Sequence, residues 1–198
     1  MKFYKNKLIG IAGTNGSGKD TLGHILVQNY GYMFISVTEL LRQECRERHM
    51  IVDRHNLSKI STEWRRKYGL SILIDKAIAE FQGIGKDEYI GLAISSLRHP
   101  GEANAIHKLG GIVIWLDADP RVRYQRIQTN SMHRSHRADE DNKTYEQFIA
   151  AEEAEMYNDG DEAALNMSAV KEKADILIDN SFEDTKQFSK HIKSILKL

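Results

Sequence analysis

Residues 13–21 read Gly-Thr-Asn-Gly-Ser-Gly-Lys-Asp-Thr and combine three glycines with a lysine at the spacing of a phosphate-binding loop. Glycines let successive backbone N–H groups turn inward around a polyphosphate, and Lys19 then reaches the outer phosphates as a point charge. A helix beginning near Lys19 would point its positive dipole end at the same anion. We expect the phosphate contacts to come from Gly13, Asn15, Gly16, Ser17, Gly18, Lys19, Asp20 and Thr21.

The segments on both sides of this loop fit that interpretation. Residues 7–12 form a short apolar run of the kind a buried parallel strand gives, and Leu22, Ile25 and Leu26 recur behind the loop at helical spacing. A strand, a glycine loop and a helix are the context that the motif requires. The alternative is a flexible strand-to-helix turn without a ligand.

Asp20 stands where the common motif has a Ser or Thr whose hydroxyl binds magnesium. Its carboxylate is a hard oxygen ligand, so it could hold Mg²⁺ directly or through water. The second interpretation is that an acidic residue in the first turn of a helix is favoured by the dipole whatever the loop binds. The sequence leaves both interpretations open.

Composition bounds the class of protein. The chain has 198 residues, and 28 Lys and Arg balance 28 Asp and Glu, which gives no global reason to expect a nucleic acid or an anionic membrane as a partner. The single cysteine, Cys45, excludes an internal disulfide and fits a reducing compartment. No apolar run approaches the length of a membrane span, and residues 1–7 lack a signal-peptide core. We expect a cytoplasmic protein.

Apolar runs alternate with helical segments, which predicts an α/β fold with a parallel sheet covered on both faces. The five expected strands are 8–12, 32–36, 89–95, 111–116 and 174–179. Helix starts are expected at Asp119 with Pro120, at Thr144 with Gln147, and at Asn180 or Ser181. We expect one domain over residues 1–198, with an insertion at about 37–86 and a mobile lid at about 128–143, because these stretches fit the alternation poorly.

With these motifs, the chain resembles P-loop kinases of the nucleoside monophosphate kinase group. It is most similar to the dephospho-CoA-kinase-like and phage-type deoxynucleoside monophosphate kinase branches, which carry Gly-Lys-Asp-Thr as residues 18–21 do here. The resemblance extends over nearly the whole chain and implies a three-layer P-loop fold with a five-stranded parallel sheet, an acceptor-binding helical insertion and a lid.

The resemblance also implies an acceptor site. Residues 36–42 resemble the exit of the second strand in the family, where an arginine grips the acceptor phosphate, and the match makes Arg42 the candidate. Residues 54–57, Arg-His-Asn-Leu, and residues 63–65, Glu-Trp-Arg, resemble the acceptor-side helices of the family, and the second of these adds Arg65. Residues 95–103 resemble the signature after the third strand, so that Arg98 becomes the second clamp. From the insertion, Trp64 and Tyr68 are the aromatic candidates for lining the acceptor pocket.

One position departs from the family pattern. Many relatives carry an aspartate near the end of the third strand to hold magnesium, and Ser95 fills the best-matching position here. Either the metal carboxylate has moved to Asp20, or the nucleotide phosphates hold most of the magnesium. Both leave catalysis feasible, because phosphoryl transfer depends chiefly on positioning and charge stabilisation.

Arginines in and beside the expected lid are candidates for stabilising the transferring phosphoryl group. Guanidinium groups that close over it neutralise charge and exclude water. We expect Arg126, Arg134 and Arg137 to act in this way, and Arg121 and Arg123 to form a solvated helix face.

These observations predict an enzyme that moves the γ-phosphoryl group of ATP, with Mg²⁺, to a small phosphorylated acceptor. A nucleoside or deoxynucleoside monophosphate is the first choice, and the ribose hydroxyl of dephospho-CoA, which would need a general base, is the second. A nucleotide-gated ATPase switch or assembly factor is the alternative from another class. We expect a monomer or homodimer that binds neither nucleic acid nor membranes.

Overall fold

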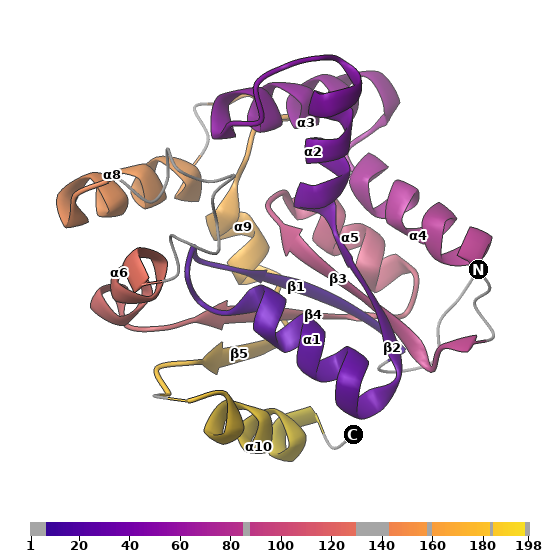
Figure 1. Ribbon diagram of the computed structural model, residues 1–198. Coiled ribbons are helices and arrows are strands. Elements are labelled where there is room, and N and C mark those ends of the chain that lie inside the picture. The colour runs from indigo at the N-terminus through magenta and orange to yellow at the C-terminus, as the bar shows by residue number, and fades with distance from the viewer. Residues whose placement is uncertain (1–6, 85–87, 130–142, 158–159, 183, 197–198) are drawn as a thin grey trace.

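The computed structural model describes residues 7–84, 88–129, 143–157, 160–182 and 184–196 (Figure 1). Its centre is a parallel sheet of five strands in the order β2-β3-β1-β4-β5. The strands are β1 Leu8–Gly13, β2 Tyr32–Ser36, β3 Gly91–Leu97, β4 Ile112–Asp117 and β5 Ile176–Asp179. The predicted α/β fold with a five-stranded parallel sheet is therefore confirmed.

The central strands are apolar because both of their faces are covered. All six residues of β1 and all seven of β3 are buried, which is why these runs are continuous rather than alternating. Along the β1–β3 pair the register shifts between Ile11 and Ala12, which places Ser96 of β3 in an irregularity with φ of 70°. This irregularity lies at the carboxyl edge of the sheet, where the loops that follow β1 and β3 begin.

Helices form the two outer layers. Their bounds are α1 Lys19–Tyr30, α2 Val37–Glu47, α3 Arg54–Tyr68, α4 Ile72–Ile84, α5 Pro100–Lys108, α6 Pro120–Thr129, α8 Tyr145–Met156, α9 Met167–Glu172 and α10 Thr185–Leu196. Figure 1 shows α1 and α10 below the sheet, and α2 to α5 with α9 above it.

Each face of the sheet has its own hydrophobic core. Ile9 and Ile11 of β1 pack with buried residues of α1 and α10, and α10 contributes Phe188 and Ile192. Leu8 and Ala12 alternate to the other face, where the core includes Trp115 and residues of α2 to α5 and α9. Because the two cores fix β1 from both sides, the loop that follows it has a rigid support.

Two of the three expected helix starts are confirmed. Asp119 Oδ1 accepts the backbone N–H groups of residues 121 and 122 at the start of α6, and Thr144 with Gln147 forms a complete capping box on α8. The expected start of the last helix at Asn180 or Ser181 is wrong. α10 begins at Thr185, and the Asp184 side chain accepts the N–H of residue 187.

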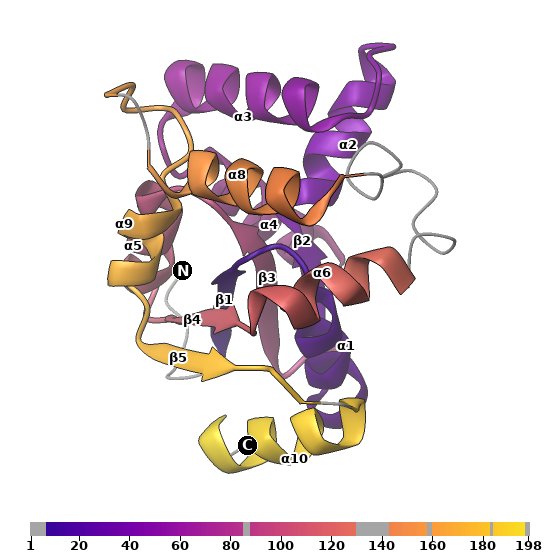
Figure 2. The same ribbon diagram turned by 90° about the vertical axis from the view of Figure 1, so that its left-hand side faces the viewer.

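The region between β2 and β3 consists of α2, α3 and α4. On the same side of the molecule, α8 lies between α3 and α6 in both views (Figures 1 and 2). It thereby brings a segment from late in the chain next to the helices that follow β2. None of the helices in the described ranges is both long and apolar enough to cross a membrane.

Candidate functional site

The loop from Gly13 to Gly18 connects β1 to α1 at the carboxyl edge of the sheet. Its three glycines all have positive φ, and Gly13 and Gly18 illustrate why glycine is required. Gly13 has φ of 139°, and a Cβ there would lie 1.9 Å from the carbonyl oxygen of Leu116, while Gly18 is the residue before α1 with φ of 95°. A side chain at either position would strain the backbone or collide with it, so these glycines shape the loop before any ligand binds.

Lys19 folds back over this loop. Its Nζ donates hydrogen bonds to the carbonyl oxygens of Gly13 at 3.0 Å and Thr14 at 2.6 Å. Burial is the main cause and the nearby charge of Arg98 the second, and together they lower the pKa of Lys19 to about 7. A cation held in this way favours the arrival of an anion, because phosphate oxygens would relieve both effects.

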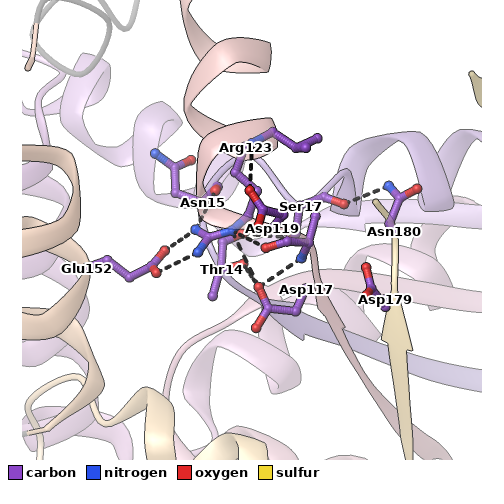
Figure 3. A network of polar contacts seen from close by, with 12 residues as sticks. Thr14, Asn15, Ser17, Asp117, Asp119, Arg123, Glu152, Asp179 and Asn180 are labelled. Carbon is purple, nitrogen blue, oxygen red and sulfur yellow. Dashed lines mark hydrogen bonds and ion pairs between the residues drawn. The ribbon is translucent and has the colours of Figure 1, made fainter. Parts of the chain in front are cut away.

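The loop is held in place from β4 and from the segment after β5 (Figure 3). Thr14 Oγ1 donates to Asp117 Oδ1 at 2.7 Å, and Asn180 Nδ2 donates to the carbonyl oxygen of Ser17 at 2.8 Å. Ser17 Oγ donates to the carbonyl oxygen of Thr14 at 2.8 Å. Asn180, expected to begin a helix, thus fixes the phosphate-binding loop instead.

Arg123 is the residue that the sequence interpretation placed wrongly. We expected it on a solvated face, but it is 2% exposed, whereas Arg121 is exposed. Its Nε donates to the carbonyl oxygen of Ala118 at 2.8 Å and its Nη1 to that of Asn15 at 3.2 Å, and both terminal nitrogens bind the carboxylate of Glu152 (Figure 3). Arg123 therefore ties α6 and α8 to the loop.

The sequence carried one signal for this burial. Arg123 lies four residues before Ile127, which is itself buried, so both residues belong to the inner face of α6. Its partner Glu152 lies 29 residues away, and nothing local marks the pair.

The other arginines expected near the lid have different outcomes. Arg126 Nη2 donates to the carbonyl oxygen of Phe182 at 2.7 Å, so its side chain is directed to the segment after β5. Burial lowers the pKa of Arg126. Arg134 and Arg137, like most of the expected lid, lie outside the described residues.

A cavity of about 440 Å³ lies among α2, α3, the end of β3 and α8. Its apolar wall includes Val37, Leu41, Leu57, Leu73 and Leu165. Its polar wall includes Thr38, Ser58, Ser61, Ser96, Arg54, Arg65, Arg98, Glu155 and Tyr157. A pocket of this size with an apolar body and a few converging polar groups is typical of a small-molecule site.

This acceptor cavity, as we call it, meets a second cavity above the phosphate-binding loop. Gly13, Thr14 and Asn15 line the second cavity. Arg54, Arg98 and Glu155 line both cavities. These three residues therefore mark the boundary between a site for polyphosphate and a site for a second molecule.

Arg54 and Arg98 both bind the same carboxylate at this boundary. Arg98 Nη1 donates to Glu155 Oε2 at 2.5 Å, and Arg54 Nη1 donates to Glu155 Oε1. The three side chains are between 22% and 26% exposed, so water reaches them only partly. Arg98 was expected in the site, and Arg54 opens residues 54–57, which resemble an acceptor-side helix, whereas the sequence did not single out Glu155.

Arg42 and Arg65, the other two expected acceptor residues, both bind acidic side chains of the protein itself. Arg42 is buried, and its Nη1 donates to Glu39 Oε2 at 3.1 Å. Arg65 reaches the wall of the acceptor cavity, but its Nη2 donates to the buried Glu102 at 2.8 Å and its Nη1 to the carbonyl oxygen of Ala163 at 3.1 Å.

The expected aromatic lining of the acceptor cavity by Trp64 and Tyr68 is wrong. The aromatic residue that lines the cavity, among those described, is Tyr157. Trp64 packs in the core, and Tyr68 is exposed.

The groups available to a magnesium ion are few. Asp20 is exposed in the first turn of α1 and acts electrostatically on Lys19, so its carboxylate lies near the phosphate site, and Thr21 follows it. Ser95 is fully buried, and its Oγ has no hydrogen-bond partner among the described residues. Nowhere in the described ranges do three His, Cys, Asp or Glu side chains form a metal-binding group. The donor set therefore fits an ion held mainly by phosphates and assisted by Asp20.

Fold and loop together define a P-loop domain, and comparison with known proteins agrees. The family model described as AAA domain matches residues 9–150, and the chain belongs to this family. Among curated relatives, a UPF0200/UPF0201 protein of Archaeoglobus fulgidus is 23% identical over 96% of this chain and 55% of its own length. A UPF0200 protein of Thermococcus kodakarensis is 21% identical over 71% of this chain and 74% of its own length. The chain thus spans about half the length of the Archaeoglobus relative.

Solved structures with the same fold include kinases. Shikimate kinase from Bacteroides thetaiotaomicron superposes with a TM-score of 0.59 at 13% identity, over 96% of this chain and 98% of that chain. Shikimate kinase from Acinetobacter baumannii in complex with shikimate superposes with a TM-score of 0.55 at 15% identity, over 97% of this chain and 94% of that chain. Identities this low establish the P-loop kinase-like fold and leave the acceptor to be argued from the site.

Proposed function

We propose that this protein transfers the γ-phosphoryl group of ATP to a small phosphorylated acceptor, with a nucleoside or deoxynucleoside monophosphate as the first choice. The observation that carries the proposal is the boundary formed by Arg54, Arg98 and Glu155. It joins the phosphate-binding loop to a cavity of about 440 Å³, so a donor and an acceptor can bind side by side. A protein that only hydrolysed ATP would need no such second cavity.

In this proposal the donor phosphates replace the carbonyl oxygens that Lys19 now contacts. The loop N–H groups and the start of α1 bind the β-phosphate, and Lys19 binds the outer oxygens. Asp20 would assist Mg²⁺, which neutralises charge on the phosphates when it is bound. Arg98 would bind the phosphate of the acceptor and hold it beside the γ-phosphorus.

The chemistry favours a phosphate acceptor over a hydroxyl acceptor. An acceptor phosphate oxygen attacks the γ-phosphorus while the bond to the ADP oxygen breaks, and an anionic oxygen needs no base. A hydroxyl would have to lose its proton to a nearby group. Glu155 is the one carboxylate among the described lining residues of the acceptor cavity, and both of its oxygens accept from arginines. This supports a monophosphate before dephospho-CoA.

The test is a panel of acceptors offered with ATP and Mg²⁺, with ADP release measured by a coupled assay. The panel contains nucleoside monophosphates, deoxynucleoside monophosphates, dephospho-CoA and shikimate, and the Lys19→Ala variant controls for contaminating kinases. We expect one class of monophosphate to raise the rate of ADP release by orders of magnitude, and this rise to disappear in the variant. Slow release that no acceptor changes would favour the ATPase switch.

A further inference from the structure

The carboxylate of Glu155 is held as an anionic ligand would be held. Two guanidinium groups from separate elements, Arg54 at the start of α3 and Arg98 after β3, each bind a different oxygen of it. Glu155 itself comes from a third element, α8, which follows the expected lid in sequence. A carboxylate gripped in this way presents the same face to arginines as two oxygens of a phosphate do.

We propose that Glu155 occupies the acceptor's anion subsite, which Arg54 and Arg98 form, and that an acceptor binds by displacing it. This inference rests on the proposed function for the identity of the incoming molecule as an acceptor. It adds Arg54 as a binding residue and makes Glu155 an internal competitor that selects which acceptors can enter.

The position of the three residues supports displacement rather than a purely structural role. All three line both cavities, so an anion that replaced Glu155 would lie between the acceptor cavity and the loop. Arg98 is close enough to Lys19 to act on its charge, which places this anion next to the donor phosphates. The ion pairs are also about a quarter exposed, so incoming anions can reach them.

The charge on the competitor sets the class of acceptor. Glu155 carries one negative charge when ionised, whereas a phosphate monoester carries about −1.5 to −2 at neutral pH and offers three acceptor oxygens. A phosphate can therefore replace both contacts of Glu155, and it carries more negative charge than the carboxylate does. A neutral alcohol would break both ion pairs of Glu155 and bring no charge in return, and a simple carboxylate would gain little over the one it displaced. The subsite thus selects phosphate monoesters.

The neighbouring turn of α8 explains how Glu155 can leave without loss of the helix. Glu152 lies one turn earlier and stays bound to Arg123, which contacts the carbonyl oxygen of Asn15 in the loop. The aromatic residues Tyr145 and Phe148 at the start of α8 pack against Tyr124 of α6. The first part of α8 is therefore anchored to α6, and only the end that carries Glu155 needs to shift.

The experiment measures the binding of inorganic phosphate by calorimetry, with ADP saturating the phosphate-binding loop so that the second anion site is observed. We expect Glu155→Gln to bind phosphate about tenfold more tightly than the unmodified protein, because one charge-assisted competitor is removed. Glu153→Gln is the matched control, since it removes the same charge from an exposed position of α8 and should leave the affinity unchanged. Glu155→Asp, which keeps the charge but shortens the reach, should give an intermediate affinity and serves if the Gln variant folds poorly.

Two further measurements test where the phosphate binds and which class of anion the subsite prefers. Arg54→Ala combined with Glu155→Gln should abolish the gain in phosphate affinity, and acetate should compete with phosphate poorly. Equal phosphate affinity in Glu155→Gln and the unmodified protein would overturn the inference, as would a gain that persists without Arg54 or acetate that competes as well as phosphate. None of these measurements needs turnover, so the proposed reaction can fail in the acceptor panel while this binding result stands.

Discussion

Binding of a nucleotide should protonate Lys19, and the size of the effect follows from its surroundings. In the free protein the pKa of Lys19 is lowered to about 7, chiefly by burial and then by Arg98. Phosphate oxygens favour the charged ammonium, so the bound protein should keep the proton well above pH 8. At about pH 8 the free lysine is mostly neutral, and ADP binding should take up about 0.9 proton, against about 0.1 proton at about pH 6.

The same linkage fixes how affinity depends on pH. Because binding takes up a proton only above the pKa of the free lysine, the affinity for ADP should fall about fivefold between pH 7 and pH 8, and about ninefold between pH 8 and pH 9. It should be nearly constant below about pH 6, apart from titration of the phosphate itself near its second pKa of about 6.

Calorimetry in two buffers of different ionisation enthalpy measures this uptake directly. ADP is titrated in the presence of a chelator, so that metal ions do not compete for the phosphates. Lys19→Met provides the control, because uptake at about pH 8 should vanish with the amine. The reasoning is refuted if the unmodified protein takes up no proton at that pH, or if uptake survives in Lys19→Met.

Three further predictions concern the remaining charged groups. Asp20→Asn should raise the Mg²⁺ concentration needed for half-maximal ADP release, and an unchanged titration would leave Asp20 as a residue of the helix start only. Arg98→Ala should raise the Michaelis constant for the acceptor far more than that for ATP, whereas equal rises would assign Arg98 to the fold. Arg65→Ala should destabilise the protein by about 3–5 kcal/mol in urea unfolding, because it leaves the buried Glu102 unpaired. A loss below about 1 kcal/mol would mean that the pair is solvated.

The parts of the fold that could be predicted are those with a local signal. Apolar runs identified all five strands, and the signal is strongest for β1 and β3 because both of their faces are buried. The spacing after Gly18 identified α1. Helix starts at Asp119 and Thr144 were predictable because a cap acts within three residues. Asn180 shows the limit of that rule, since its side chain serves a loop more than 160 residues earlier in the chain.

The site was predicted where a motif fixes it and missed where distant pairs build it. The glycine loop and Lys19 follow from the spacing of the motif, and Arg98 was named because residues 95–103 resemble a family signature after the third strand. Glu155 meets Arg54 across 101 residues and Arg98 across 57, and no pattern in one sequence specifies such partners. Arg42 and Arg65 are arginines of the same chemical type, but Arg42 pairs with the exposed Glu39 on its own helix and Arg65 pairs with the buried Glu102.

The central claim is that a phosphoryl group passes between two bound molecules. The most direct measurement uses ATP with a radioactive γ-phosphoryl group, the acceptor that gives the fastest ADP release, and separation of the products. We predict that the label appears in the diphosphate of the acceptor in equal amount to the ADP formed. Label found only in inorganic phosphate, with the acceptor unchanged, would contradict the claim and identify the protein as an ATPase.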